Sequence, residues 1–233
     1  MYQFTSRVRF SETDENGCLT LAAIVNYLQD CTLFHSEELG AGGAWNAKRD
    51  RAWMLSGWQI EIRRRPRFLE TITIVTRPYQ FTGMLGYRWF EILDEQGEQL
   101  VFANSVWCFV QPSKMRPVRL TEEDMRPYLP NDPVPDSAFE RKIPIPGSGE
   151  VMEPIIVRRD HLDTNHHVNN GQYIVMATDY VPEGFSYRKI RVEYKNQARL
   201  GDRIVPVVTR EEGRLTVVLG DGAKLVNAVV LFE

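Results

Sequence analysis

The sequence contains two copies of one unit, and this duplication limits the folds open to the chain more than any other feature. A shift of 149 residues superposes residues 163–179 on 14–30, and a shift of 132 superposes residues 193–204 on 61–72. Two blocks that recur in the same order indicate an internal repeat. The first copy has 17 more residues (149 − 132) between its blocks, within residues 41–58. The identical pairs are Asp163 with Asp14, Asn165 with Asn16, Asp179 with Asp30, Glu193 with Glu61, Arg199 with Arg67 and Ile204 with Ile72.

The two copies differ in the residues that can carry chemistry. Residues 163–170 read Asp-Thr-Asn-His-His-Val-Asn-Asn, and His167 falls on Cys18 of the first copy. Asp163 and His167 can handle protons, and Asn165 between them can hold a substrate or a water. The helix start that follows offers backbone N–H groups to a developing oxyanion. We therefore expect a catalytic site in the C-terminal half.

Size and charge exclude several classes of protein. The 233 residues are 43% hydrophobic, which supplies a core for one large domain or two smaller ones. The net charge is −3 at pH 7, whereas a nucleic-acid binder needs a basic face. The chain has no run of about 18 apolar residues for a membrane span, and its first residues do not resemble a signal or transit peptide. Its three cysteines lack metal-ligand spacing, so we expect reduced thiols, no metal and a cytoplasmic location.

Hydrophobic periodicity predicts an α+β protein in which each half has a long helix wrapped by a curled antiparallel sheet. The first helix is predicted over residues 21–39 and ends at Gly40. Residues 121–154 hold seven of the 13 prolines and are predicted to link an N-terminal domain, 1–120, to a C-terminal domain, 155–233. The other predictions are strands over 71–77, 86–93 and 99–110, a helix over 170–180, and strands over 187–194, 203–209, 215–219 and 224–232.

The block Asp-x-Asn-x-His-Val-Asn-Asn-x-x-Tyr at residues 163–173 resembles the acyl-acyl carrier protein thioesterases. The similarity extends over nearly the whole chain and includes residues 9–14, 24–30, 53–62 and 116–117. That family has a double hotdog fold, so the resemblance implies a tandem hotdog. It also implies a cofactor-free enzyme of fatty acid biosynthesis. Such an enzyme hydrolyses the thioester of fatty acyl-acyl carrier protein, releases the free fatty acid and ends chain elongation.

By the same resemblance, Asp163, Asn165 and His167 form the catalytic set. A thioester carbonyl is electrophilic and its thiolate leaves easily, so an activated water or a carboxylate nucleophile with an oxyanion site suffices. Asp163 would act as base or nucleophile, while His167 and Asn165 position water and thioester. The helix start over residues 168–171 would polarise the carbonyl. The accessory candidates are Gln197, Asn169 and Gly171.

Positions 197 and 198 depart from the family pattern, which has a Glu-Cys pair on the strand after the motif. Gln197 and Ala198 stand there in this chain. Ala198 has no thiol, so a cysteine nucleophile at that position does not apply. Gln197 can orient a water but cannot take a proton, which leaves the acid–base work to Asp163 and His167. A slower or altered enzyme is compatible with this exchange.

Several other polar residues have simpler interpretations. His166 is expected to point away from the site, while His35 and His161 are expected to be an ordinary helix residue and an ordinary loop residue. Asn169 and Asn170 are most simply helix caps. The first-copy residues expected to hold turns and helix ends are Asp14, Asn16 and Asp30.

The predicted partner is acyl carrier protein, whose strongly acidic surface could dock on a basic strand. One candidate is the arginine-rich run at residues 63–67. Symmetry with a hotdog dimer favours a second cluster in the catalytic half. That cluster consists of Arg188, Lys189, Arg191 and Lys195.

The first copy is the expected host of the acyl chain, because it lacks the histidine and keeps four tryptophans near its sheet. The extra residues within 41–58 would form a lid or a longer loop. One chain supplies both halves of a hotdog pair, so no partner chain is required, and a homodimer of such chains is also compatible. The tryptophans are Trp53, Trp58, Trp89 and Trp107.

Three alternatives to acyl-carrier-protein hydrolysis stay open. An acyl-coenzyme A thioesterase would use the same chemistry. A hotdog hydratase acting on enoyl thioesters has Asp-x-Asn-Pro with its histidine five positions after the aspartate, whereas His167 lies four positions after Asp163 and no proline is present. A non-catalytic module would bind the acyl thioester without turnover.

Overall fold

The computed structural model describes residues 1–129 and 139–233. The chain divides into two compact units, one formed by residues 1–56 and 62–139 and the other by residues 57–61 and 140–233. The predicted linker, 121–154, contributes to both units, and its residues 130–138 lie outside the described part. Within the described ranges, no helix is long and apolar enough to cross a membrane.

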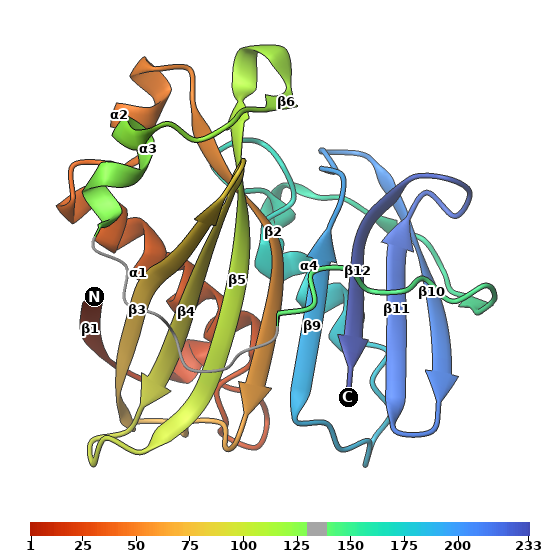
Figure 1. The fold of residues 1–233 in the computed structure, drawn as a ribbon. Coiled ribbons are helices and arrows are strands. Elements are labelled where there is room, and N and C mark those ends of the chain that lie inside the picture. The colour runs from red at the N-terminus through yellow and green to blue at the C-terminus, as the bar shows by residue number, and fades with distance from the viewer. Residues whose placement is uncertain (130–138) are drawn as a thin grey trace. The chain divides into compact units, whose positions relative to one another are not determined.

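The first unit places a long helix against an antiparallel sheet (Figure 1). The helix is α1 (Leu21–Glu38), and the hydrogen-bonded strand order is β1-β3-β4-β5, with β2 next to β5. This arrangement agrees with the predicted helix and the three predicted strands. The strands are β1 (Tyr2–Arg7), β2 (Ala52–Ile62), β3 (Thr71–Thr82), β4 (Leu85–Leu93), β5 (Gln99–Gln111) and β6 (Arg116–Pro117).

Helix α1 begins and ends where its sequence requires. The Thr20 side chain accepts a hydrogen bond from the backbone N–H of Ala23, which caps the first turn. One face of the helix is buried, including Ile24, Leu28 and Cys31. Gly40 follows the helix with φ of +68°, a left-handed conformation that glycine adopts without a Cβ clash. The predicted terminator is therefore confirmed.

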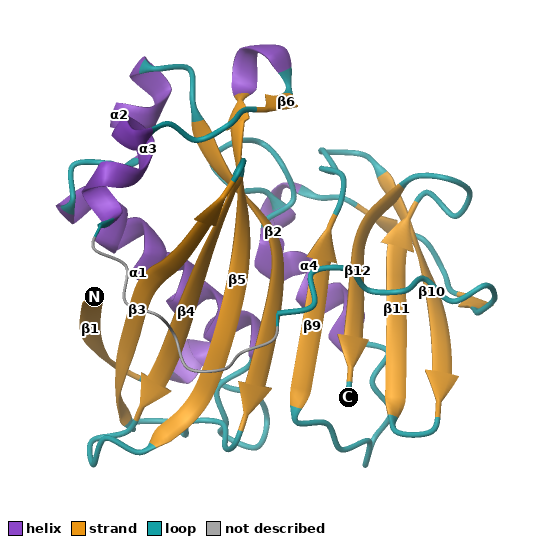
Figure 2. Ribbon diagram, viewed as in Figure 1, coloured by secondary structure: helices purple, strands orange, loops and turns teal. Residues whose placement is uncertain are grey.

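The second unit repeats this arrangement with shorter elements (Figure 2). Its strand order is residues 57–61 of β2, then β9-β12-β11-β10-β7, and β8 also pairs with β10. Helix α4 (Asn170–Thr178) packs on β11 and β12 and is two residues shorter than predicted. The strands are β7 (Glu150–Val151), β8 (Ile155–Ile156), β9 (Lys189–Tyr194), β10 (Arg203–Glu211), β11 (Arg214–Gly220) and β12 (Val226–Phe232).

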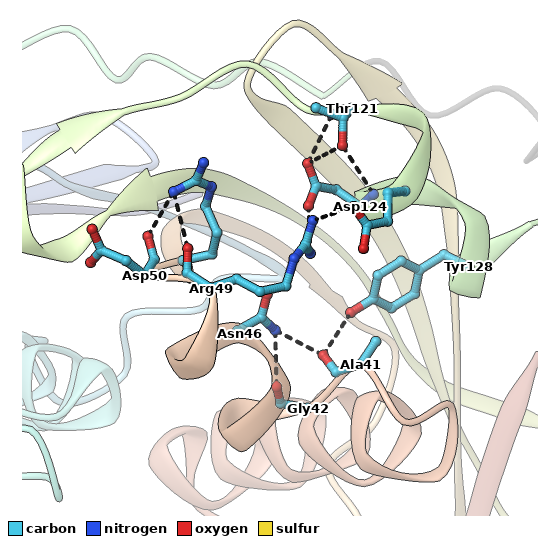
Figure 3. A network of polar contacts seen from close by, with 10 residues as sticks. Ala41, Gly42, Asn46, Arg49, Asp50, Thr121, Asp124 and Tyr128 are labelled. Carbon is cyan, nitrogen blue, oxygen red and sulfur yellow. Dashed lines mark hydrogen bonds and ion pairs between the residues drawn. The ribbon is translucent and has the colours of Figure 1, made fainter.

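The extra residues of the first copy form helix α2 (Gly43–Lys48) and the start of β2. Polar contacts fasten α2 to helix α3 (Glu122–Met125), which lies inside the predicted linker (Figure 3). Arg49 forms a 2.8 Å ion pair with Asp124, and the Asn46 amide donates to the Ala41 carbonyl at 2.8 Å. Burial alone would raise the pKa of Asp124, but hydrogen bonds from Thr121 and Arg49 outweigh it and lower that pKa. These contacts thus attach the insertion to helix α3, which follows β6 in the chain.

A buried basic pair lies between α1 and the sheet of the first unit. His35 is 6% exposed and Arg88, on β4, is 5% exposed. The Arg88 guanidinium lies 2.9 Å from His35 Nδ1, and it donates to Thr76 Oγ1 at 3.4 Å. Because guanidinium nitrogens only donate, His35 Nδ1 accepts this bond, which requires a neutral imidazole with its proton on Nε2. Burial and the neighbouring Arg88 charge lower the pKa of His35 to about 3.

This histidine predicts a specific loss of stability in acid. The unfolded chain binds a proton at His35 below about pH 6.5 whereas the folded chain stays neutral until about pH 3, so the free energy of unfolding should fall as the pH drops through this window. The slope from this group is at most about 1.4 kcal/mol per pH unit. Denaturant unfolding of wild type and His35→Gln between pH 6.5 and 4 measures it. Glutamine can accept from Arg88 but does not titrate, so its curve should be flatter; parallel curves would contradict the assignment.

Candidate active site

The residues of the conspicuous motif form a tight turn organised by the Asp163 carboxylate. Its Oδ1 accepts the backbone N–H groups of Asn165 at 2.8 Å and His167 at 3.2 Å. The Asn165 amide donates weakly to Oδ2 at 3.4 Å. A backbone bridge between Leu162 and Val168 closes the turn. These bonds hold Asp163 in a fixed position. Its Oδ1 binds the backbone of the turn, whereas its Oδ2 has only the long contact with the Asn165 amide among the described residues.

The first copy contains the same turn at the equivalent positions. Asp14 Oδ1 accepts the backbone N–H groups of Asn16 at 2.9 Å and Cys18 at 3.0 Å. Thr13 and Leu19 form the equivalent closing bridge. These bonds confirm that the first-copy Asp14 holds a turn, and they confirm the repeat at the level of single hydrogen bonds.

His166 occupies the position that Gly17 occupies in the first copy. His166 has φ of +61°, and Gly17 in the first copy has φ of +69°. Each donates its backbone N–H to the carbonyl of the turn aspartate, at 3.1 Å and 2.9 Å. The His166 side chain is exposed. Its backbone conformation is imposed by the turn, and the expectation that its side chain points away from the site stays a prediction.

The second oxygen of the turn aspartate has different neighbours in the two copies. Asp14 Oδ2 accepts a 2.6 Å hydrogen bond from the Arg65 guanidinium. Burial would raise the pKa of Asp14, but hydrogen bonds from the Cys18 amide and Arg65 outweigh it and lower that pKa. The shift of 132 places Gln197 on Arg65. Because glutamine carries no charge, the second copy cannot neutralise Asp163 in this way.

Three of the four backbone amides expected to serve as donors at the start of helix α4 have partners within the protein. The N–H of Val168 donates to the Ala198 carbonyl at 2.9 Å, and that of Asn169 to the His161 carbonyl at 2.9 Å. The N–H of Gly171 donates to the Asn169 side chain at 2.8 Å. Asn169 is thus the predicted helix cap. These three amides are therefore not free donors in this structure, and the polarising role of the helix start over residues 168–171 stays a prediction.

Two tyrosines that sequence reasoning left without a role fix the loop after β9. Ala198 is 1% exposed, and its backbone N–H donates to the Tyr173 hydroxyl at 3.1 Å. The Tyr194 hydroxyl donates to the Asn170 carbonyl at 3.0 Å. Burial raises the pKa of Tyr173 to about 12, so its hydroxyl stays protonated. The repeat could have revealed Tyr173, because its first-copy counterpart is Ile24 and the counterpart of Ala198 is Pro66, which has no N–H to satisfy.

The catalytic candidates are gathered in this one turn, and the docking candidates are not. Within the described residues, the half-buried His167 ring makes no hydrogen bond or ion pair, so a structural Asp163–His167 side-chain bond is not present. Gln197 is exposed on the loop that follows β9. Arg191 is 6% exposed and donates to the carbonyls of residues 140 and 142 at 2.7 and 2.9 Å. It is therefore unavailable for docking a carrier at the surface.

No metal site accompanies the turn. Across residues 1–129 and 139–233, no group of three or more histidine, cysteine, aspartate or glutamate side chains is placed to hold an ion. The arrangement instead offers a fixed carboxylate beside an imidazole and an amide. Such a set can activate water or attack an electrophilic carbonyl.

Sequence profiles of a single family match both halves of the chain. The acyl-ACP thioesterase N-terminal domain matches residues 1–128, and the acyl-ACP thioesterase C-terminal domain matches residues 148–228. Together the two profiles match well over half of the chain.

Curated relatives carry related names at modest identity. A chloroplastic acyl-[acyl-carrier-protein] hydrolase of Cuphea viscosissima is 26% identical over 87% of this chain and 52% of its own length. A chloroplastic oleoyl-acyl carrier protein thioesterase of Arabidopsis thaliana is 27% identical over 88% of this chain and 61% of its own length. The chain therefore spans about half to three-fifths of the length of these relatives.

Solved structures establish the fold. An acyl-ACP thioesterase from Bacteroides thetaiotaomicron superposes with a TM-score of 0.90 at 22% identity and covers 99% of this chain and 96% of its own. A 12:0-ACP thioesterase from Umbellularia californica gives a TM-score of 0.85 at 19% identity and covers 100% and 96%. These similarities confirm the predicted fold class, with two hotdog units in one α+β chain.

The backbone of the turn predicts how position 166 responds to substitution. His166→Gly should leave the free energy of unfolding within about 1 kcal/mol of wild type, because glycine adopts positive φ freely but costs more chain entropy. His166→Val should destabilise by about 1–2 kcal/mol, because a branched Cβ crowds the left-handed conformation. Chemical denaturation measures both, and Gly17→Val is the matched control, whose destabilisation should be similar to the stability difference between the valine and glycine variants at position 166. Equal stability of the valine and glycine variants would show that the turn does not impose this backbone.

Proposed function

Because the chain belongs to the acyl-ACP thioesterase family, we propose that it hydrolyses the thioester of a fatty acyl-acyl carrier protein and releases the free fatty acid. The names of the curated relatives support this reaction. The relatives are longer than this chain, so the substrate and the carrier belong to the proposal. Acyl-coenzyme A hydrolysis is the alternative that the same chemistry would serve.

One observation carries the assignment of the site, namely the different surroundings of the two turn aspartates. Both use Oδ1 to hold their turn, but among the described residues an arginine binds Oδ2 of Asp14 and none binds Oδ2 of Asp163. A carboxylate that is paired with a guanidinium is a weak base and a weak nucleophile. Replacement of that arginine by Gln197 keeps Asp163 Oδ2 reactive, so we assign the chemistry to the second unit.

In the proposed reaction, Asp163 Oδ2 provides the basic oxygen. As a general base it would take a proton from water while the water oxygen bonds to the thioester carbon; as a nucleophile it would bond to that carbon itself, and water would then hydrolyse the anhydride. In both routes the carbon–sulfur bond breaks and the departing thiolate takes a proton. A thiolate is a good leaving group, so no strong acid is needed at the sulfur.

His167 and Asn165 would orient the reactants around this oxygen. Both follow Asp163 in the same turn, and their backbone N–H groups bind its Oδ1, so the three side chains share one rigid support. The His167 ring can position or protonate a water, and the Asn165 amide can donate to a carbonyl oxygen. The amide of Gln197, on the loop fixed by Tyr173, is an additional donor.

The central prediction concerns Asp163 and His167. Asp163→Asn keeps an Oδ1 that can accept the two turn N–H groups but removes the basic oxygen, and His167→Ala removes the imidazole. Each should lower turnover of acyl-acyl carrier protein well over tenfold with little change in unfolding temperature. Free-thiol release from purified protein measures the reaction, and Asp14→Asn is the matched control that should keep near wild-type turnover, as should Cys18→Ala.

Two outcomes would overturn these assignments. Wild-type protein that retains acyl thioester without releasing thiol above background would be a binding module rather than a hydrolase. Hydrolysis by wild type together with full activity of Asp163→Asn would move the chemistry to other residues.

A second prediction tests the role of position 197. Gln197→Arg would rebuild the first-copy pair on Asp163, so turnover should fall at least tenfold and the pH at which the activity rises should move down, because a neighbouring guanidinium lowers a carboxyl pKa. A pH–rate profile measures both effects. Gln197→Met, which is uncharged and of similar length, is the control that separates charge from packing. If arginine and methionine reduce activity equally and leave the profile in place, the electrostatic explanation fails.

A further inference from the structure

Four arginines lie in segments that precede the proposed catalytic turn or are hydrogen-bonded to its neighbours. Arg158 and Arg159 precede it in the chain, whereas Arg199 and Arg203 lie on the loop after β9 and at the start of β10. All four side chains are exposed. None of them forms an ion pair with the described residues. We refer to these four residues as the arginine cluster.

Backbone hydrogen bonds bring the four together beside the turn. Val157, which precedes Arg158, donates to the Asp202 carbonyl at 2.9 Å and accepts from the Gly201 N–H at 3.0 Å. Arg203 pairs with Ile156 between β10 and β8. The Ala198 carbonyl, next to Arg199, accepts the N–H of Val168, which directly follows His167. The arginine cluster and the proposed active site therefore belong to one hydrogen-bonded group of loops.

The equivalent region of the first copy lacks this arrangement. Arg9, the counterpart of Arg158, forms a 3.4 Å ion pair with Glu12, and the residue equivalent to Glu12 in the second copy is His161. The counterparts of Arg159 and Arg203 are Phe10 and Thr71, so only Arg67 matches an exposed arginine without an ion pair in the described chain. At these four equivalent positions, exposed arginines without an ion pair in the described chain are therefore more numerous in the second copy, beside the turn that differs in chemistry.

On the basis of the function proposed above, we infer that the arginine cluster is the docking surface for the acidic carrier protein that delivers the acyl thioester. A guanidinium presents a planar fork that binds carboxylates in pairs, and several exposed arginines steer an acidic protein toward one face. Acidic side chains in the same loops, Asp160 and Asp202, limit the positive field to the arginine side chains themselves. The carrier would then hold its pantetheine arm next to Asp163.

The cluster suggested by sequence symmetry is less suitable. Arg191 is buried, and Lys195 pairs with Glu193 at 2.8 Å. Arg188 and Lys189 lie at the start of β9, whereas the loop that contacts the turn leaves its other end. Six strand residues separate these ends by roughly 17–20 Å. A carrier bound at the start of β9 would be farther from Asp163 than one on the arginine cluster.

Paired substrates test the inference. The double variant Arg159→Gln/Arg203→Gln should lower kcat/KM for acyl-acyl carrier protein at least tenfold, mainly through KM, and should flatten its dependence on salt. Hydrolysis of a neutral acyl-pantetheine should stay within twofold of wild type, which also shows that the variant is folded. The matched control compares Arg199→Gln with Arg67→Gln, because the two exposed arginines occupy equivalent positions. Only Arg199→Gln should lower kcat/KM for acyl-acyl carrier protein.

The remaining outcomes each contradict one statement. No hydrolysis of either substrate by wild type would refute the proposed function. Hydrolysis of both by wild type, with carrier activity unchanged in the double variant or lowered equally for both substrates, would refute only the docking surface. Equal losses for acyl-coenzyme A and acyl-acyl carrier protein would show that the arginines bind a phosphate rather than the carrier surface, and would also overturn the inference.

Discussion

The structure depends on one interaction used twice, in which an aspartate Oδ1 accepts the N–H groups of residues two and four positions ahead. Asp14 and Asp163 each make this pair of bonds. A helix with a side-chain cap follows each turn, α1 after the first and α4 after the second. The same turns are hydrogen-bonded to the loops that follow β2 and β9, because Leu19 donates to the Pro66 carbonyl and Val168 donates to the Ala198 carbonyl. The carboxylate therefore fixes the start of each helix relative to its own sheet.

The two turns have the same backbone, so exchanges of single side chains are enough to give them different chemistry. Arg65 neutralises Asp14, whereas Gln197 cannot neutralise Asp163. Exchange of Pro66 for Ala198 adds a buried N–H, and exchange of Ile24 for Tyr173 supplies the hydroxyl that satisfies it. These exchanges leave the loop in place while they change its charge. A structural turn and a proposed catalytic turn are thus separated by a few side chains around one backbone.

The sequence predicted most of the fold because the repeat and the period of its apolar residues are local signals. Helix α1, its glycine terminator and the main strands followed from them, and the Gln197 exchange was readable from the same alignment of the two copies. The sequence could not show which backbone N–H groups at the start of helix α4 are free to donate to a substrate. Whether the N–H of Val168 or Asn169 is free depends on carbonyls of Ala198 and His161, which only the folded loops bring near. The direction of Arg191 likewise depends on residues 140–142, which cover that face of β9.

The two oxygens of Asp163 have separate roles, since Oδ1 holds the turn and Oδ2 is available for the proposed reaction. Oδ1 is committed to the turn, so the plane of the carboxylate is set before any substrate binds, and Oδ2 inherits that orientation. A reacting group that is already oriented loses little entropy on approach to its target. A glutamate would add one rotatable bond and could not reach the same two N–H groups without changing the turn. An aspartate at this position therefore serves the fold and the proposed reaction through the same short side chain, provided that no cation occupies its second oxygen.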